Sequence, residues 1–212
     1  MTITKDNVKK ALKKTWYFIW ENDSIWSWIL NIILAFVLIK FIIYPGLGLV
    51  LGTNYPIVAV VSGSMEHDGN FDTWWESSAA CKENLCSQEQ WYNNYGISRS
   101  EFEGYRFNNG FNKGDIIFLS GVRADKVNEG DVVVFQTSYR KEPIIHRVVK
   151  ISSKEGNNIY QTKGDHNMDS GKYDENIQES QVIGKGVFKV PYLGWIKIGF
   201  VNLLGMLGLH IS

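Results

Sequence analysis

The sequence has few of the residues that build metal sites, and it has no excess charge of either sign. It contains two cysteines and four histidines among 212 residues. Cys81 and Cys86 have only His67 near them in the sequence, whereas structural zinc sites use four ligands. The 22 basic side chains are balanced by 22 acidic ones, while nucleic-acid-binding domains usually carry a basic excess. We therefore expect neither a metal site nor a nucleic-acid partner.

A long apolar run near the N-terminus predicts a membrane anchor. Residues 25–44 read IWSWILNIILAFVLIKFIIY, and about 20 such residues in a helix cross the roughly 30 Å core of a bilayer. A cleavable signal peptide has a shorter apolar region followed by a small-x-small site, but this run is followed by PGLGLVLG. The run also has too few polar groups for a core helix with one exposed face. We predict a transmembrane helix over residues 25–45, ended by Pro45.

The charges around this run predict its orientation. Lysines precede it at positions 5, 9, 10, 13 and 14, and positively charged flanks tend to stay in the cytoplasm. Residues 1–24 are therefore predicted to form a cytoplasmic, basic, amphipathic segment on the inner leaflet. Everything after Pro45 is then extracytoplasmic, which predicts a single-pass protein of the plasma membrane.

The chain after the anchor has the short, β-branched runs of an all-β domain. Candidate strands are IVAVV, DIIFLS, DVVVFQ, IIHRVVKI, NIYQT and VIGKGVFKV, separated by turn-forming residues. We predict a mainly β fold, with an extracytoplasmic domain over residues 46–191 and an insertion over about 67–112. Residues 192–212 repeat apolar side chains at helical spacing. For that segment an interfacial helix, a second span and a helix packed on the β domain all stay open.

The insertion is rich in tryptophan and contains both cysteines. An extracytoplasmic environment is oxidising, so a Cys81–Cys86 disulfide is the favoured interpretation, with a pair of free thiols as the alternative. Trp74, Trp75 and Trp91 either form a small local core or contact the membrane surface, and the local core is favoured.

Residues 61–66, VSGSME, present two hydroxyls at a turn. A serine becomes an effective nucleophile only beside a general base and with donors for the developing oxyanion. The candidate base is His146, which strand alternation places on one face with Ile144 and Val148. Taken alone, a core histidine bonded to a backbone carbonyl explains His146 better than catalysis does. A nearby carboxylate changes that balance.

The loop TKGDHNMDSGKYDEN, residues 162–176, supplies the acidic side chains Asp165, Asp169, Asp174 and Glu175. A carboxylate beside an imidazole fixes its tautomer and stabilises the imidazolium that forms when it takes a proton. Turn formation alone explains the presence of Asp169. Asp165 and Asp174 are therefore the candidates for the acid beside His146.

SGSM after the anchor is followed in order by KGDIIFL, EGDVVVF, PIIHRVV, TKGDHN and VIGKGVFKVPYLGW. Together these motifs resemble the type I signal peptidases, specifically the archaeal and endoplasmic-reticulum branch, over most of the chain from Ile25 onward. The resemblance implies a signal-peptidase-like β domain tethered by an N-terminal transmembrane helix. In the bacterial branch a lysine holds the base position, and here His146 occupies it.

The resemblance also implies a role for each matching residue around the turn. Ser64 matches the nucleophile, and its backbone amide, with the Ser62 hydroxyl, is expected to receive the oxyanion. Gly63 and Met65 belong to the same oxyanion and substrate-binding motif, and Gly63 lets the backbone turn sharply beside a substrate chain.

The acid is assigned by the spacing of the family motif. Asp165 matches the first acidic position of the Gly-Asp-x-Asn motif. The second family aspartate usually follows six residues later, but position 171 is glycine. Counting back from VIGK makes Asp174 the better counterpart than Asp169.

The implied activity is removal of N-terminal signal peptides from secreted preproteins at the outer face of the membrane. Acyl transfer through Ser64 needs no metal or organic cofactor, and a histidine base predicts activity that falls at acidic pH. Preproteins, the lipid bilayer and the secretion translocon are the expected partners. Two alternatives are an inactive membrane-tethered binding module that uses the tryptophan-rich insertion, and a peptidase for other membrane-anchored precursors.

Overall fold

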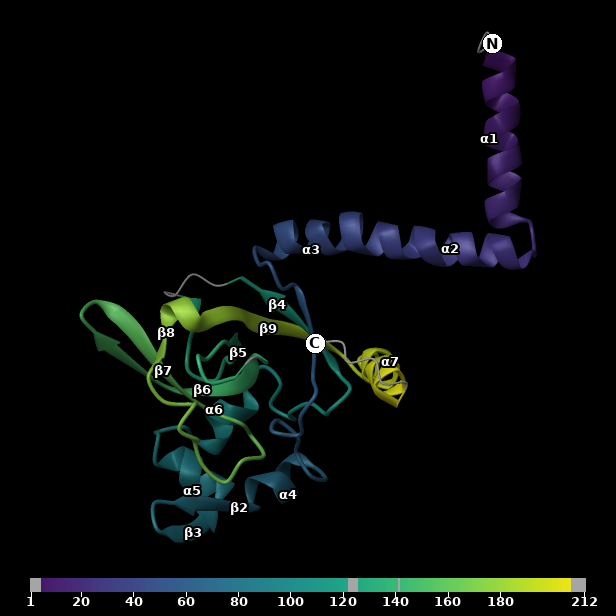
Figure 1. Cartoon of the computed structure of the whole chain (residues 1–212). Helices are drawn as coiled ribbons and strands as arrows, with labels where there is room; N and C mark the ends of the chain where they lie inside the picture. The colour runs from purple at the N-terminus through teal and green to yellow at the C-terminus, as the bar shows by residue number, and fades with distance from the viewer. Residues whose placement is uncertain (1–4, 122–125, 141, 207–212) are drawn as a thin grey trace. The chain divides into compact units, whose positions relative to one another are not determined.

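The computed structural model describes residues 5–121, 126–140 and 142–206. The chain divides into two compact units, with the boundary between Val50 and Leu51. The first unit is helical, and the second contains a β-sheet, the insertion and a C-terminal helix (Figure 1).

The N-terminal unit begins with α1 (Lys5–Trp20), whose side chains are exposed or half-buried throughout. The next helix, α2 (Ile25–Leu38), starts where the Ser24 side chain accepts a hydrogen bond from the Ser27 N–H. Such a cap satisfies one of the free N–H groups of the first turn. Most of the predicted amphipathic segment before the apolar run is thus helical.

The apolar helix does not end at Pro45. A π-helical segment, η1 (Ile39–Ile43), joins α2 to α3 (Tyr44–Leu51). The continuous helix over Ile25–Leu51 contains an 18-residue stretch with a mean hydropathy of 2.3 and is long and apolar enough to cross a membrane. Proline has no N–H and its ring collides with the carbonyl four residues back, but the Tyr44 N–H already bonds the Ile39 carbonyl in a wider π turn. The prediction that Pro45 stops the helix is therefore wrong.

The second unit contains one large antiparallel sheet. In the described residues it has seven strands in the order β1-β4-β9-β5-β6-β7-β8. Their bounds are β1 (Ile57–Ala59), β4 (Ile116–Ser120), β5 (Val132–Phe135), β6 (Ile144–Lys154), β7 (Asn157–Lys163), β8 (Ile177–Gln178) and β9 (Val182–Val190). A 3₁₀ turn, η3 (Glu179–Gln181), links β8 to β9. Each predicted run overlaps one of these strands, and the mainly β fold with an N-terminal apolar helix is confirmed.

Strand β6 is covered on both faces. Ile144 and Val148 belong to a cluster with Val133, Phe135 and Tyr160, whereas Val149 joins the aromatic cluster of the insertion. Successive side chains of a strand point to opposite faces. Residues 146 and 147 are therefore directed into two different environments, which decides how the site is built.

The insertion has its own short helices and hairpin within the second unit. It contains α4 (Phe71–Trp75), the hairpin of β2 (Ser78–Cys81) and β3 (Asn84–Ser87), α5 (Gln88–Asn93) and α6 (Arg99–Glu103), which lie together beside the sheet in Figure 1. Cys81 and Cys86 form a disulfide across the hairpin, which confirms the predicted pairing. Trp74, Trp75 and Trp91 are at most 2% exposed, so the interpretation as a local core is also confirmed.

The C-terminal helix α7 (Trp195–Met206) is attached to the sheet at its first turn. The Gly194 N–H bonds the Gly114 carbonyl at 2.8 Å, and the Trp195 ring lies so close to Gly114 that a methyl group there would collide with it. Further along, Phe200 and Met206 are 59% and 84% exposed. The alternative of a helix packed on the β domain along its whole length is therefore wrong for α7, and residues 207–212 lie outside the described part.

Candidate active site

The two serines lie at a turn that follows β1. The Glu66 N–H bonds the Gly63 carbonyl at 3.1 Å to close the turn, and the Met65 side chain is fully buried in the core between β1, β4 and β5. Burial of Met65 fixes the turn and leaves the Ser62 hydroxyl exposed and Ser64 half-buried. Their Oγ atoms lie 3.3 Å apart.

His146 is held by Asp174. The imidazole is on β6, and its Nδ1 lies 2.5 Å from Oδ1 of Asp174. An ionised carboxylate only accepts hydrogen bonds, so Nδ1 carries the proton and Nε2 presents its lone pair. Asp174 is itself oriented by the Thr162 hydroxyl at 2.6 Å and by the Gly171 N–H at 2.9 Å. The pair therefore has one orientation, with Nε2 ready to accept a proton.

The electrostatics keep Asp174 ionised. Burial acts to raise its pKa, but the hydrogen bond and charge of His146 and the hydrogen bonds from Thr162 and Gly171 outweigh burial, so the pKa of Asp174 is lowered overall. An ionised carboxylate at this position stabilises a positively charged imidazole.

Gly164 brings the serine turn and the histidine together. A methyl group at Gly164 would lie 2.7 Å from the Ser64 carbonyl oxygen and 2.8 Å from Nε2 of His146, so only glycine fits. Next to it, the His166 N–H bonds the Ser64 carbonyl at 2.9 Å. The face of His146 that carries Nε2 is therefore directed at the turn that carries Ser64.

Asp165 belongs to a different network. Its carboxylate is fully buried and accepts hydrogen bonds from Nε and Nη2 of Arg147 at 2.9 and 2.6 Å, from Tyr92 at 3.1 Å and from Nε2 of His67 at 3.1 Å. Burial acts to raise its pKa, but the charge of Arg147 and the hydrogen bonds from His67 and Arg147 together outweigh burial, so the pKa of Asp165 is lowered overall. The structure thus brings Ser62, Ser64, His146 and Asp174 to one place and directs Asp165 elsewhere.

Asp169 is a structural side chain in this arrangement. Its Oδ1 accepts the hydrogen bond of the Trp91 indole at 2.8 Å, and its Oδ1 also receives the Ser170 N–H at 2.7 Å. Asp169 therefore joins the 162–176 loop to the insertion rather than to His146.

Sequence reasoning did not identify Gly164, Arg147 or Lys163 as parts of the site's framework. Arg147 follows His146 directly, and the strand alternation that assigned His146 to one face also assigns Arg147 to the other, where a buried guanidinium needs an acid. Strand alternation could therefore have predicted an acidic partner for Arg147. The close approach at Gly164 depends on how three distant segments meet, and no local pattern reports it.

Comparisons with known proteins find similarity to the catalytic subunits of signal peptidase complexes. Over 162 residues the chain is 30% identical to the signal peptidase complex catalytic subunit SEC11C of Homo sapiens and of Mus musculus, which covers 74% of this chain. Over 179 residues it is 28% identical to the catalytic subunit SEC11 of Scheffersomyces stipitis, covering 80% of this chain and 82% of that protein. The chain is a homologue of signal peptidase catalytic subunits.

The resemblance that the sequence motifs indicated is thereby confirmed. This signal peptidase homologue spans 62% of the length of the SEC11C proteins that it matches. No family model matches the chain.

Proposed function

We propose that this signal peptidase homologue is a membrane-anchored serine endopeptidase that removes N-terminal signal peptides from secreted preproteins. The observation that carries the proposal is the spatial arrangement of Ser64, His146 and Asp174. His146 is fixed by Asp174 on its Nδ1 side, and its Nε2 side is directed at the turn of Ser64 across Gly164. A nucleophile, a base and a group that orients the base are the components of acyl transfer by serine.

The mechanism follows from the positions of these groups. Ser64 Oγ attacks the scissile carbonyl while Nε2 of His146 takes its proton, and Asp174 stabilises the imidazolium. The imidazolium then protonates the leaving amine, and a water that gives its proton to the same nitrogen hydrolyses the acyl-enzyme. Both serine hydroxyls act here, because the Ser62 hydroxyl lies 3.3 Å from Ser64 Oγ and can donate to the oxyanion alongside the Ser64 N–H.

The substrate is an extended chain that leaves a membrane. Strand β1 is an edge strand in the described sheet and leads directly into the serine turn. An extended peptide can therefore pair with it as an additional strand. The apolar helix over Ile25–Leu51 provides the anchor. We place the lysine-rich α1 on the cytoplasmic side and the catalytic unit outside the plasma membrane, with the bilayer and the secretion translocon as partners.

The test is cleavage of a membrane-inserted preprotein by the purified chain, beside matched variants. Ser64→Ala and His146→Ala should each abolish product formation, while Ser153→Ala, an exposed serine on β6, should cleave as wild type does. If wild type and Ser64→Ala are equally inactive on every signal-peptide substrate, the peptidase proposal fails. Retained binding of the same preprotein would then favour an inactive binding module.

A further inference from the structure

Lys163, at the end of β7, is a buried cation that the mechanism does not use. Its side chain is fully buried, and its ammonium meets three oxygen acceptors: Oε1 of Gln88 at 2.7 Å, the Gly164 carbonyl at 3.2 Å and the Asp165 carbonyl at 3.3 Å. An ammonium has three donors, so these contacts use all of them. Two of the acceptors are the peptide carbonyls that immediately follow Lys163.

The aromatic core of the insertion completes this environment. The ammonium lies 4.9 Å from the Trp91 ring and 5.1 Å from the Tyr92 ring, where the faces of the rings attract a cation. Burial lowers the pKa of Lys163 to about 7, against the raising effect of nearby Asp165 and Asp169. A buried charge is tolerated only when its donors are satisfied, so the surrounding groups must keep their positions.

Gln88 is the residue of the insertion that meets this ammonium. It is the first residue of α5, it is 1% exposed, and its Nε2 donates to the Ser78 carbonyl at 3.3 Å and to the Asn167 carbonyl at 3.2 Å. Both of its N–H groups and its carbonyl are therefore engaged. The amide of Gln88 connects the disulfide hairpin to both ends of the turn over residues 163–167.

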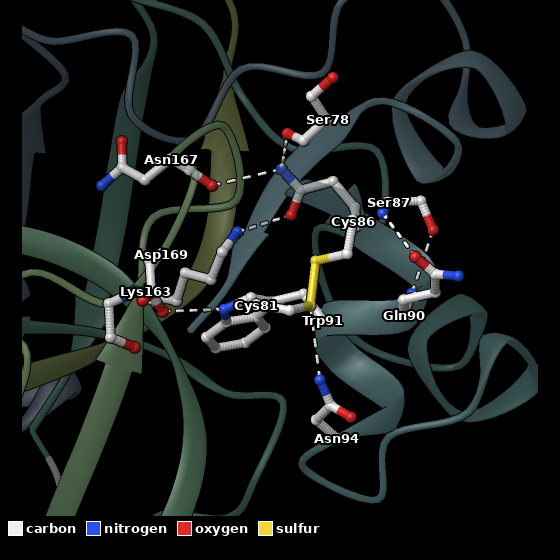
Figure 2. The surroundings of a disulfide bond; sticks show 12 residues. Ser78, Cys81, Cys86, Ser87, Gln90, Trp91, Asn94, Lys163, Asn167 and Asp169 are labelled. Atoms are coloured by element: carbon white, nitrogen blue, oxygen red, sulfur yellow. Dashed lines mark hydrogen bonds between the residues drawn. A yellow bond between two sulfur atoms is a disulfide. The ribbon is translucent and has the colours of Figure 1, made fainter. Parts of the chain in front are cut away.

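Further hydrogen bonds join the insertion to the same loop. The Ala80 N–H bonds the Met168 carbonyl at 2.8 Å, the Trp91 indole bonds Asp169 and the Trp74 indole bonds the Asp165 carbonyl at 3.0 Å. Figure 2 shows Lys163, Asn167 and Asp169 facing the Cys81–Cys86 hairpin and Trp91. The insertion therefore contacts this loop repeatedly from one side.

The other side of the loop touches the reacting groups. Gly164 has no room for a methyl group between the Ser64 carbonyl and Nε2 of His146, the His166 N–H bonds the Ser64 carbonyl, and the Asp165 N–H lies 3.4 Å from Sδ of Met65. A displacement of the loop is therefore transmitted to the relation between Ser64 and His146. Small misplacements of reacting groups reduce rates strongly.

We infer that Lys163 is a positioning residue, which with Gln88 of the insertion clamps the 163–169 loop and so sets the distance between the Ser64 turn and His146. The inference rests on the proposed function for its catalytic consequence, but the clamp itself is a property of the fold. It gives the tryptophan-rich, disulfide-containing insertion a role in the peptidase site, without contact between the insertion and the substrate.

Amide hydrogen exchange on the full-length chain in detergent tests the clamp without any substrate. Lys163→Met and Gln88→Leu should each make residues 164–169 exchange at least about tenfold faster while residues 144–150 of β6 stay as in wild type. The double variant should exchange no faster than Lys163→Met, because the two side chains act as one unit. The exposed residues Lys150 and Glu89 supply the control variants Lys150→Met and Glu89→Gln, which should leave both regions unchanged.

Two exchange results overturn the inference. One is unchanged exchange over residues 164–169 in both single variants. The other is equally faster exchange in β6, because Lys163 would then support the whole fold rather than this loop.

Steady-state cleavage supplies the second readout. Lys163→Met should lower kcat by about 100-fold and leave KM within about twofold, since the clamp does not touch the substrate. A raised KM with unchanged kcat would contradict a positioning role. If wild type cleaves no signal-peptide substrate, the proposed function fails, and the exchange experiment still decides whether the clamp exists.

Discussion

His146 and Arg147 are neighbours on β6, and each binds a different aspartate of the 162–176 loop from an opposite face of the strand. His146 contacts Asp174 at 2.5 Å, and Arg147 contacts Asp165 at 2.6 Å. The same strand therefore carries the proposed general base on one side and a buried ion pair on the other. The sequence alone did not decide between Asp165 and Asp174 as the acid beside His146, and the structure gives each carboxylate a different partner.

Substitution of each aspartate by asparagine should distinguish a catalytic role of Asp174 from a structural role of Asp165. Asp174→Asn keeps the shape but favours the wrong imidazole tautomer, and we expect kcat to fall by about 10⁴-fold with a small change in stability. Asp165→Asn leaves the Arg147 guanidinium buried without its charge partner, and unfolding free energy should fall by about 3–5 kcal/mol. Denaturant unfolding and cleavage kinetics on both variants check this, and an Asp165→Asn enzyme that is stable but inactive would contradict it.

Gly164→Ala should damage catalysis through a steric collision. The added methyl group would lie 2.7 Å from the Ser64 carbonyl and 2.8 Å from Nε2 of His146, so one of them must move, and we expect kcat to fall by about 100-fold. Gly199→Ala in α7 is the control, because nothing lies within 4 Å of its new methyl group. The cleavage rate of Gly164→Ala should be far below that of Gly199→Ala. Equal rates would show that the site tolerates the movement that the added methyl group forces.

The pH dependence of cleavage should have a descending limb on the acidic side. The lowered pKa of Asp174 keeps the carboxylate charged as pH falls, so the hydrogen bond that orients the proposed base persists, while a histidine base in general loses its proton-accepting lone pair in acid. The measurement is kcat/KM for a soluble signal-sequence peptide across the acidic range. A rate that stays constant there would show that another group takes the serine proton.

Stability should rise with pH in the alkaline range because of Lys163. Its folded pKa is about 7 against 10.5 for the free side chain, so between these values the unfolded chain binds more protons than the folded one. Unfolding free energy should therefore increase by up to about 1.4 kcal/mol per pH unit from pH 7 to 10.5. Chemical denaturation at several pH values should show this slope in wild type and a smaller one in Lys163→Met.

Loss of the disulfide should destabilise the insertion moderately. Cys81 and Cys86 are five residues apart, and closing so short a loop in the unfolded chain contributes about 2 kcal/mol in the chain-entropy account. We expect the unfolding free energy of the Cys81→Ser/Cys86→Ser variant to fall by about that amount, which lowers the denaturant concentration at its unfolding midpoint. Identical midpoints for the variant and for oxidised wild type would show that the hairpin holds without the bond.

The sequence predicted most of the fold because its signals are local. The alternating, β-branched runs identify six of the strands, whereas β8 has only two residues and is too short for a pattern. The apolar run predicts a helix, but Pro45 misled the prediction of its end, because a π turn upstream depends on backbone geometry that composition does not report. The three-way meeting of Ser64, His146 and Gly164 joins segments far apart in the chain, and only the folded sheet defines it.

The insertion leaves and rejoins the sheet at almost one point. The Phe111 N–H bonds the Met65 carbonyl at 3.0 Å, so the segment between them begins and ends at a single hydrogen bond and does not disturb the antiparallel register of β1 with β4. The pairing of β1 with β4 therefore does not depend on the length of the insertion, whereas the 163–169 loop receives hydrogen bonds from it. A chain shortened between Met65 and Phe111 is expected to keep that pairing and to lose both the contacts that hold the loop and the cover over Val149 of β6.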